Sequence, residues 1–124
     1  MSTTQFVDEN NVIRFSVDGK EKLAVAETLD LEKSEVLISL SGDLVNALAL
    51  AFLDELNALA SMDAKITLDL SELNYIGNLG VDALLDVQRQ MDIQGKGLLT
   101  LTKVPPPILQ ELKRVGVADL LMIE

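Results

Sequence analysis

Apolar and polar residues alternate along residues 12–17, which is the period of a β-strand with one buried face. The next two residues, Asp18-Gly19, form a favoured two-residue hairpin turn, and residues 20–26 then return with apolar side chains at Leu23 and Val25. This pattern predicts a β-hairpin. Residues 27–34 are polar and charged, so we expect a connector there. We treat residues 1–34 as an N-terminal extension that carries the hairpin and belongs to the same domain as the rest.

From residue 35 the pattern changes to strands that alternate with helices. Residues 36–40 are almost continuously apolar, as in a strand that is covered on both faces. Residues 44–60 then carry apolar side chains at helical spacing (positions 45, 48, 52, 56 and 59), with Asp43 as the expected N-cap. We expect a second strand over residues 65–70 and a loop over residues 71–77.

The same alternation continues to the end of the chain. A second helix is expected to begin with Asn78 as its N-cap and to present one mostly apolar face (Val81, Leu84, Leu85, Gln88 and Met91). The sequence Gly95-Lys96-Gly97 ends this helix, and residues 98–102 suggest a third strand. Pro107 suits the first turn of a third helix, which Gly116 ends. The tail at 117–123 is either a last strand or a turn.

Strands and helices in this order imply parallel strands joined by right-handed crossovers. We therefore predict an α/β fold with a mostly parallel central sheet and helices packed on it, formed by residues 35–124, plus the N-terminal β-hairpin. In such folds, partners and ligands gather where the strand C-termini meet the helix N-termini. The loop at residues 73–80 is one such place.

The composition fits one domain that lacks the commonest catalytic groups. The chain has 124 residues, 48% of them hydrophobic, which is enough to bury a core. It contains no Cys and no His, which removes disulfides, thiolate chemistry, the commonest general base and most metal sites. Asp69 and Asp82 flank the loop as a carboxylate pair, but acids at a strand end and in a first helical turn have simpler structural roles. We expect no cofactor, no metal and no enzymatic activity.

The net charge narrows the class of partner. A formal charge of −10 disfavours nucleic acid and anionic membrane surfaces. No apolar run approaches the roughly 20 residues that span a bilayer, and residues 1–11 lack the features of a secretory signal, so we expect no membrane insertion and a cytoplasmic location. Residues 43–92 hold nine acids against only Lys65 and Arg89. Such a run is either a solvated face or a surface that steers a basic partner.

Residues 68–80, Leu-Asp-Leu-Ser-Glu-Leu-Asn-Tyr-Ile-Gly-Asn-Leu-Gly, resemble the signature of the STAS domain family, the family of the anti-sigma factor antagonists. That signature combines an apolar strand, an Asp-Leu-Ser-like turn, an apolar pair and an Asp-Ser-Ser-Gly sequence that opens a helix. Two further segments agree with the family. Residues 36–44 end in Ser-Gly-Asp-Leu, and residues 103–120 run from Lys-Val-Pro to Gly-Val-Ala-Asp-Leu. The resemblance covers about residues 35–123.

The resemblance implies a STAS-like fold and a non-enzymatic regulatory module that binds a protein partner, often a GHKL-type serine kinase that doubles as an anti-sigma factor. In many members that kinase phosphorylates the Ser at the helix start and thereby breaks the complex. Here Gly77 stands where the family has Asp, Asn78 where it has the phosphoacceptor Ser and Leu79 where it has the second Ser, whereas Gly80 keeps the Gly. Because an amide cannot be phosphorylated, we expect this surface to stay uncharged.

We expect partner binding to involve seven residues at or near this motif (Tyr75, Gly77, Asn78, Leu79, Gly80, Asp82 and Asp86). Asn78 also has a simple structural role as an N-cap. The two glycines are expected to serve the backbone, one in an unusual turn and the other in close helix packing. Leu79 is either an interface anchor or a residue tucked under the loop.

Two other functions stay open. The chain could be a fixed scaffold subunit of a stressosome-like or lipid-transport assembly, with the hairpin and the acidic middle as assembly contacts. It could also be a small-molecule sensor at the strand-end crevice, although an aromatic content of 3% disfavours a pocket. Self-association into a homo-oligomer is open as well.

Overall fold

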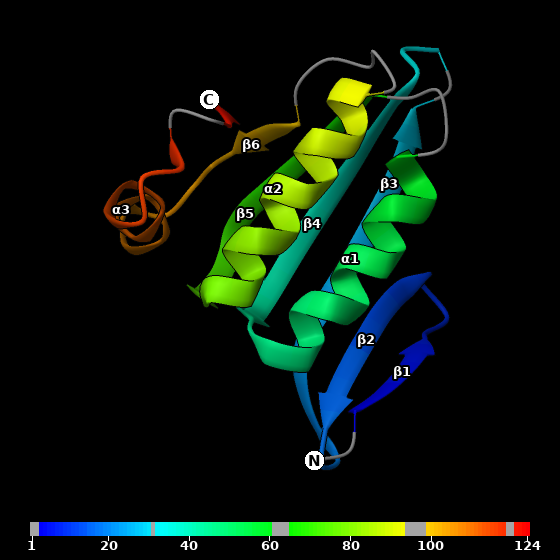
Figure 1. The fold of residues 1–124 in the computed structure, drawn as a ribbon. Coiled ribbons are helices and arrows are strands. Elements are labelled where there is room, and N and C mark those ends of the chain that lie inside the picture. The colour runs from blue at the N-terminus through cyan, green and yellow to red at the C-terminus, as the bar shows by residue number, and fades with distance from the viewer. Residues whose placement is uncertain (1–2, 31, 61–64, 94–98, 119–120) are drawn as a thin grey trace.

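The computed structural model describes residues 3–30, 32–60, 65–93, 99–118 and 121–124, and these form one sheet with three helices (Figure 1). The seven strands of the sheet are β1 (Thr3–Val7), β2 (Val12–Val17), β3 (Lys20–Asp30), β4 (Glu35–Leu44), β5 (Lys65–Ile76), β6 (Thr100–Thr102) and β7 (Met122–Ile123). The helices are α1 (Asn46–Ala60), α2 (Asn78–Ile93) and α3 (Pro106–Arg114). Strand order in the sheet follows chain order from β1 to β7.

The sheet is mixed, so the prediction of a mostly parallel sheet is wrong. Strands β1 to β4 pair antiparallel, whereas β4 to β7 pair parallel. The sheet is mixed because β3 continues to Asp30, through part of the predicted connector, and so joins the N-terminal strands to β4. Strand β3 pairs with β4 from Leu23↔Gly42 to Asp30↔Glu35. The N-terminal strands are therefore continuous with the rest of the sheet.

The predicted β-hairpin is confirmed as β2 and β3, which pair from Val12↔Ala26 to Val17↔Lys20. Asp18 and Gly19 have φ angles of 52° and 82°, the left-handed region that this two-residue turn requires. Strand β1 was not predicted. It adds to the outer side of β2, with Thr3 opposite Val17.

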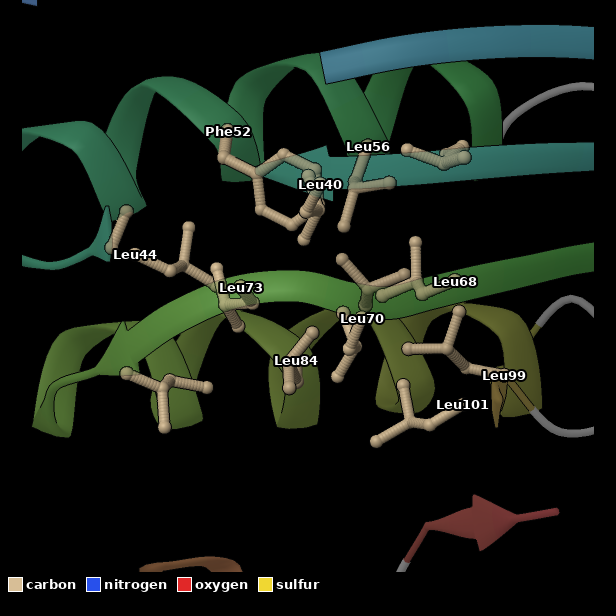
Figure 2. Close-up of a cluster of buried hydrophobic side chains, with 14 of the residues drawn as sticks. Leu40, Leu44, Phe52, Leu56, Leu68, Leu70, Leu73, Leu84, Leu99 and Leu101 are labelled. Carbon is tan, nitrogen blue, oxygen red and sulfur yellow. The ribbon is translucent and has the colours of Figure 1, made fainter. Parts of the chain in front are cut away.

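Helices α1 and α2 pack on one face of the sheet with an apolar core between them and the strands. Figure 1 shows α1 and α2 side by side on one face of the sheet, running along β4 and β5, with α3 beyond α2 on the side of β6. Figure 2 shows one cluster formed by side chains from α1, β4, β5 and α2 (Phe52, Leu56, Leu40, Leu68, Leu70 and Leu84), all fully buried. Each such side chain stabilises the fold by about 1.5–3 kcal/mol relative to exposure. Aliphatic residues dominate this core, as the low aromatic content requires.

A buried amide fastens α2 to the chain that enters β6. Gln88 is buried, and its Oε1 accepts a hydrogen bond of 2.6 Å from the backbone N–H of Leu99. Its Nε2 donates to Asp92 Oδ1 at 3.4 Å. The predicted inward face of α2 therefore includes one polar residue because a backbone donor near β6 needs a partner.

Strand β5 is longer than predicted. It continues to Ile76 and pairs with β4 as far as Leu44↔Ile76, with register shifts on the way. The predicted loop at residues 71–77 is therefore wrong except at Gly77, because residues with a polar sequence pattern complete a strand at the sheet's end. The extension brings the last residues of β4 and β5 together at the start of α2.

The third helix begins and ends where the sequence predicts. Pro106 and Pro107 occupy its first turn after Pro105, where their missing N–H groups cost no helical bond. At the other end Gly116 has a φ of 79°. Val117 N–H donates to Leu112 O at 3.0 Å and Gly116 N–H donates to Lys113 O at 3.1 Å, which is a Schellman motif. None of the helices in the described part of the chain is long and apolar enough to cross a membrane.

Candidate partner-docking surface at the start of helix α2

The predicted site residues lie where β5 passes into α2. Gly77 N–H donates to Leu44 O at 3.0 Å, and the carbonyl of Gly77 accepts from Val81 N–H at 3.0 Å. The residue whose carbonyl accepts the first helical bond is the N-cap, so Gly77 is the N-cap and Asn78 is the first helical residue. The N-cap prediction for Asn78 is therefore wrong by one position. Asn78 is exposed.

The N-cap of α1 also differs from the prediction, here by two positions towards the C-terminus. The carbonyl of Val45 accepts from Leu48 N–H at 3.0 Å and from Ala49 N–H at 3.3 Å. Val45 is therefore the N-cap of α1, and the prediction for Asp43 is wrong. Asp43 instead belongs to the end of β4, opposite Tyr75 of β5. This register puts Asp43 next to the start of α2.

The two glycines of the motif differ in their roles. A Cβ atom at Gly80 would overlap the carbonyl oxygen of Leu44 and lie 2.8 Å from Ile76 Cγ1, so close packing of α2 requires glycine there. The backbone of Gly77 is not in the left-handed region, and a Cβ there would meet Val45 Cγ1 at 3.2 Å. The predicted close packing is confirmed at Gly80, whereas an unusual turn at Gly77 is not found.

Side chains on either side of this junction face outwards. Tyr75 at the end of β5 is 57% exposed and Leu79 in the first turn of α2 is 41% exposed. Asp82 is also exposed, one turn further along α2. Asp86 is partly buried and pairs with Arg89, with Oδ1 3.4 Å from Nη1. The alternative in which Leu79 is tucked under the loop is thereby excluded.

Three shallow hollows surround the first two turns of α2. The first, of about 560 Å³, is lined by Asp43, Val45, Tyr75, Gly77, Asn78 and Leu79. The second, of about 260 Å³, lies between α1 and α2 and is lined by Leu50, Leu53, Leu79, Asp82, Ala83, Leu85, Asp86 and Arg89. The third, of about 170 Å³, lies between α2 and the end of α3 and is lined by Asn78, Val81, Asp82, Leu85, Val115 and Val117.

The hollows share walls, so they form one surface. Leu79 lines the first and second hollows, Asn78 the first and third, and Asp82 the second and third. We call the residues that line the three hollows the docking surface. Of the seven predicted site residues, six line it; Gly80 is buried and acts from beneath by fixing the position of α2.

Sequence reasoning missed the part of the docking surface that comes from other elements. Leu50 of α1 is 54% exposed and faces the second hollow, opposite Leu79 and Leu85. A signal for it exists, because Leu50 is an apolar residue that falls outside the helical stripe at positions 45, 48, 52, 56 and 59. Val115 and Val117, from the end of α3, could not be placed beside α2 from the sequence pattern alone.

The docking surface combines an apolar floor with mostly acidic charges, so the expectation of an uncharged surface is wrong for it as a whole. Among its described lining residues the acids are Asp43, Asp82 and Asp86, and the cation is Arg89, which already pairs with Asp86. Asp43 is partly buried and Asp82 is exposed, and their negative charge beside apolar residues favours a partner that carries basic side chains.

Asp69, the other member of the predicted carboxylate pair, has a structural role. Its Oδ1 accepts from Ser71 N–H at 3.0 Å, and Lys103 Nζ lies 3.8 Å from its Oδ2. These contacts, led by the Ser71 backbone hydrogen bond, lower the pKa of Asp69 below its ordinary value. Asp69 is thus held as an anion at the end of the β5–β6 pairing. Within the described residues no three or more carboxylates gather into a group that could hold a metal ion.

Comparisons with known proteins agree with this architecture. Residues 27–124 match the family model described as Mlab, STAS domain. No curated protein matches the sequence. The fold is similar to that of an anti-sigma factor antagonist from Mycobacterium paratuberculosis, with a TM-score of 0.67 and 15% identity over 80% of this chain and 84% of that one.

Two further solved structures have the same fold. A variant of RsbS from Moorella thermoacetica has a TM-score of 0.67 and 16% identity, over 81% of this chain and 85% of that one. The anti-sigma factor antagonist SpoIIAA in its unphosphorylated form has a TM-score of 0.63 and 16% identity, over 81% of this chain and 86% of that one.

Proposed function

Because this chain belongs to the STAS domain family, we propose that it is a non-enzymatic regulatory module that docks a protein partner through the docking surface. The proposed partner is a GHKL-type serine kinase or anti-sigma factor, and docking does not involve phosphorylation at the usual position. The fold that the chain shares with anti-sigma factor antagonists supports a regulatory protein-binding role.

The observation that carries the proposal is the placement of Leu79. It is an exposed apolar side chain in the first turn of α2, between two hollows that a partner's side chains can fill. Interfaces typically derive most of their affinity from a few such central contacts, surrounded by polar residues that exclude water. Asn78 and Asp82 provide polar neighbours on the same turns of the helix.

The second part of the proposal concerns the missing switch. Asn78 is exposed as the first residue of α2, at the position that corresponds to the phosphoacceptor of the family. The free N–H groups of a helix start suit a phosphate, but an amide side chain offers no hydroxyl to accept one. ATP therefore cannot dissociate a complex formed here through phosphorylation of residue 78.

The test is to mix the purified chain with a GHKL-type serine kinase encoded beside it and to measure binding with and without ATP. We expect a complex with the same dissociation constant in both conditions and no phosphorylated form of the chain by mass spectrometry. Loss of binding on ATP addition, together with a phosphorylated product, would contradict the proposal. Substituting Leu79 separates binding through the docking surface from binding elsewhere.

A second candidate function is that of a fixed subunit in a larger assembly. The exposed amide of Asn78 favours this function, because a contact at that position is not broken by phosphorylation. A fixed subunit co-purifies with its partner at constant stoichiometry and does not exchange with added free chain. We expect a regulatory module to exchange with added free chain, so an exchange experiment with isotope-labelled chain distinguishes the two functions.

A further inference from the structure

Strand β1 lies at one edge of the sheet and has no counterpart in the family match. The match begins at residue 27, so β1 and β2 precede it. Among the described residues, β1 pairs with β2 alone. On its other side, alternate backbone N–H and C=O groups of β1 point away from the sheet, which is an arrangement that accepts another strand.

This edge lacks the features that usually prevent strand addition. Protected edges carry charged residues, proline or a bulge, whereas β1 reads Thr-Thr-Gln-Phe-Val and pairs with β2 without a register shift. Phe6 is 55% exposed and Val7 is 57% exposed. As neighbours in a strand they lie on opposite faces of the sheet, so apolar surface borders the edge on both sides.

We propose that β1 pairs antiparallel with β1 of a second copy of this chain, which joins two sheets into one across a two-fold axis at Gln5. Full pairing of Thr3–Val7 with itself places Gln5 opposite Gln5, Phe6 opposite Thr4 and Val7 opposite Thr3. Aromatic and β-branched residues are the types that stabilise such cross-strand pairs. The interface is isologous, as most homodimer interfaces are.

Charge favours a second copy at this edge. The chain has a net charge of −10, so two copies can approach closely only where few carboxylates face each other. β1 has no charged residue. The first acid after it, Asp8, directs its carboxylate back to its own hairpin, where it accepts from Val12 N–H at 3.0 Å, from Asn10 N–H at 2.8 Å and from Arg14 Nε at 2.8 Å. Asp8 is therefore neutralised within one chain.

The proposed dimer leaves both docking surfaces accessible. Figure 1 shows β1 at the edge of the sheet that is farthest from α2 and α3. A dimer of this kind presents two copies of the docking surface to a dimeric partner, which raises the effective affinity through bivalency. The inference does not depend on the proposed function, since it concerns the chain alone.

The test is sedimentation equilibrium of the full chain over a wide concentration range, with charge-swap variants at Gln5. We expect a species of twice the 13.5 kDa chain mass that dissociates on dilution. Gln5→Glu and Gln5→Lys each place like charges opposite each other and raise the dimer dissociation constant about fivefold. An equimolar mixture of the two variants regains dimerisation, because opposite charges then meet at the axis.

Gln110→Glu on the exposed side of α3 is the matched control and leaves the dissociation constant unchanged. Gln5 is exposed, so thermal melts of its variants should coincide with that of the wild type. A wild-type chain that stays at 13.5 kDa at millimolar concentration overturns the proposal. So does a dimer that the Gln5 charges do not weaken, or one that the mixture fails to restore, since the copies then meet elsewhere.

Discussion

Gly80 packs against the carbonyl oxygen of Leu44 so closely that a Cβ atom at Gly80 would overlap that oxygen. This contact joins the first turn of α2 to the last residue of β4. It sets the distance between α2, which carries much of the docking surface, and the sheet. Glycine within a helix costs about 1 kcal/mol relative to alanine, so close approach of the backbone is the reason it stands here.

Replacing this glycine should therefore destabilise the protein. We expect Gly80→Ala to lower the free energy of unfolding by about 1–3 kcal/mol, because overpacking outweighs the gain in helix propensity. Urea denaturation measures the change. Gly77→Ala is the matched control, with its nearest contact at 3.2 Å, and should cost no more than about 1 kcal/mol. Equal losses in the two variants would show that Leu44 does not set the position of α2.

Leu79 should account for a large part of partner affinity. We expect Leu79→Ala to raise the dissociation constant of the kinase complex at least about tenfold, since it removes the apolar contact between the two hollows. The free energy of unfolding of the Leu79→Ala variant should differ from that of the wild type by less than about 0.5 kcal/mol, because the Leu79 side chain is exposed. Ile93→Ala, at the other end of α2 and 73% exposed, serves as the control and should bind like the wild type.

Asn78→Ser should introduce a phosphorylation switch at the start of α2. We propose above that Asn78 occupies the position of the family's phosphoacceptor, and on that proposal the kinase partner should phosphorylate a hydroxyl at the first position of α2. ATP should then weaken its complex while leaving the wild-type complex intact. Phosphoprotein gels and binding titrations with ATP measure both effects. Asn74→Ser, at an exposed position of β5, is the control and should remain unmodified. If the Asn78→Ser variant is phosphorylated and still binds as tightly as before, the partner does not dock at the start of α2.

The acidic residues of the docking surface should act mainly on the rate at which a partner associates. We expect Asp82→Asn to lower the association rate constant with a basic partner by about two- to fivefold, and to reduce its dependence on salt. Stopped-flow mixing at low and high ionic strength measures this effect. Glu9→Gln removes one charge from the turn after β1, far along the chain from the docking surface, and should leave the rate unchanged.

Glu27 makes the stability of the fold depend on pH. Its carboxyl lies on β3 against Glu55 of α1, and its Oε1 is buried without a hydrogen-bond partner. Desolvation, together with the Glu55 carboxyl, raises the pKa of Glu27 from 4.5 to about 7. The folded state therefore holds a proton that the unfolded chain releases above pH 4.5, so stability falls as the pH rises from 4.5 to about 7 and then levels off.

We expect this loss to be about 1 kcal/mol after allowance for solvent screening, and we expect Glu27→Gln to remove it. Urea midpoints at pH 5 and pH 8 provide the measurement. Glu32→Gln, at an exposed position, should keep the wild-type difference between the two pH values. A difference that persists in Glu27→Gln would assign the pH dependence to other carboxyls.

Local sequence signals predicted the elements whose ends are set by local chemistry. The turn at Asp18-Gly19, the prolines that begin α3 and the Gly116 that ends it are all placed correctly, because each depends on backbone preferences within a few residues. The motif around Gly80 was likewise found at a helix start. Strand pairing was harder. That β3 runs on to Asp30 beside β4 depends on contacts between segments, which periodicity does not record.

The candidate site shows the same division. Residues 75–86 could be identified from the sequence because they follow each other along one junction. Leu50 and Val117 reach the docking surface from α1 and from beyond α3, and only the packing of the helices reveals them. The N-cap assignments at Asp43 and Asn78 failed because carbonyl acceptance, rather than a polar side chain, defines the first turn of each helix.

In the described sheet, each strand pairs with the next strand along the chain, from β1 to β7. Within the described residues no strand lies between two strands that both precede it in the chain, so the sequence separation of paired strands stays low, and a low separation favours fast folding. During synthesis, the ribosome therefore releases strands in the order in which the growing sheet can accept them, and each new strand covers the edge left open by the last.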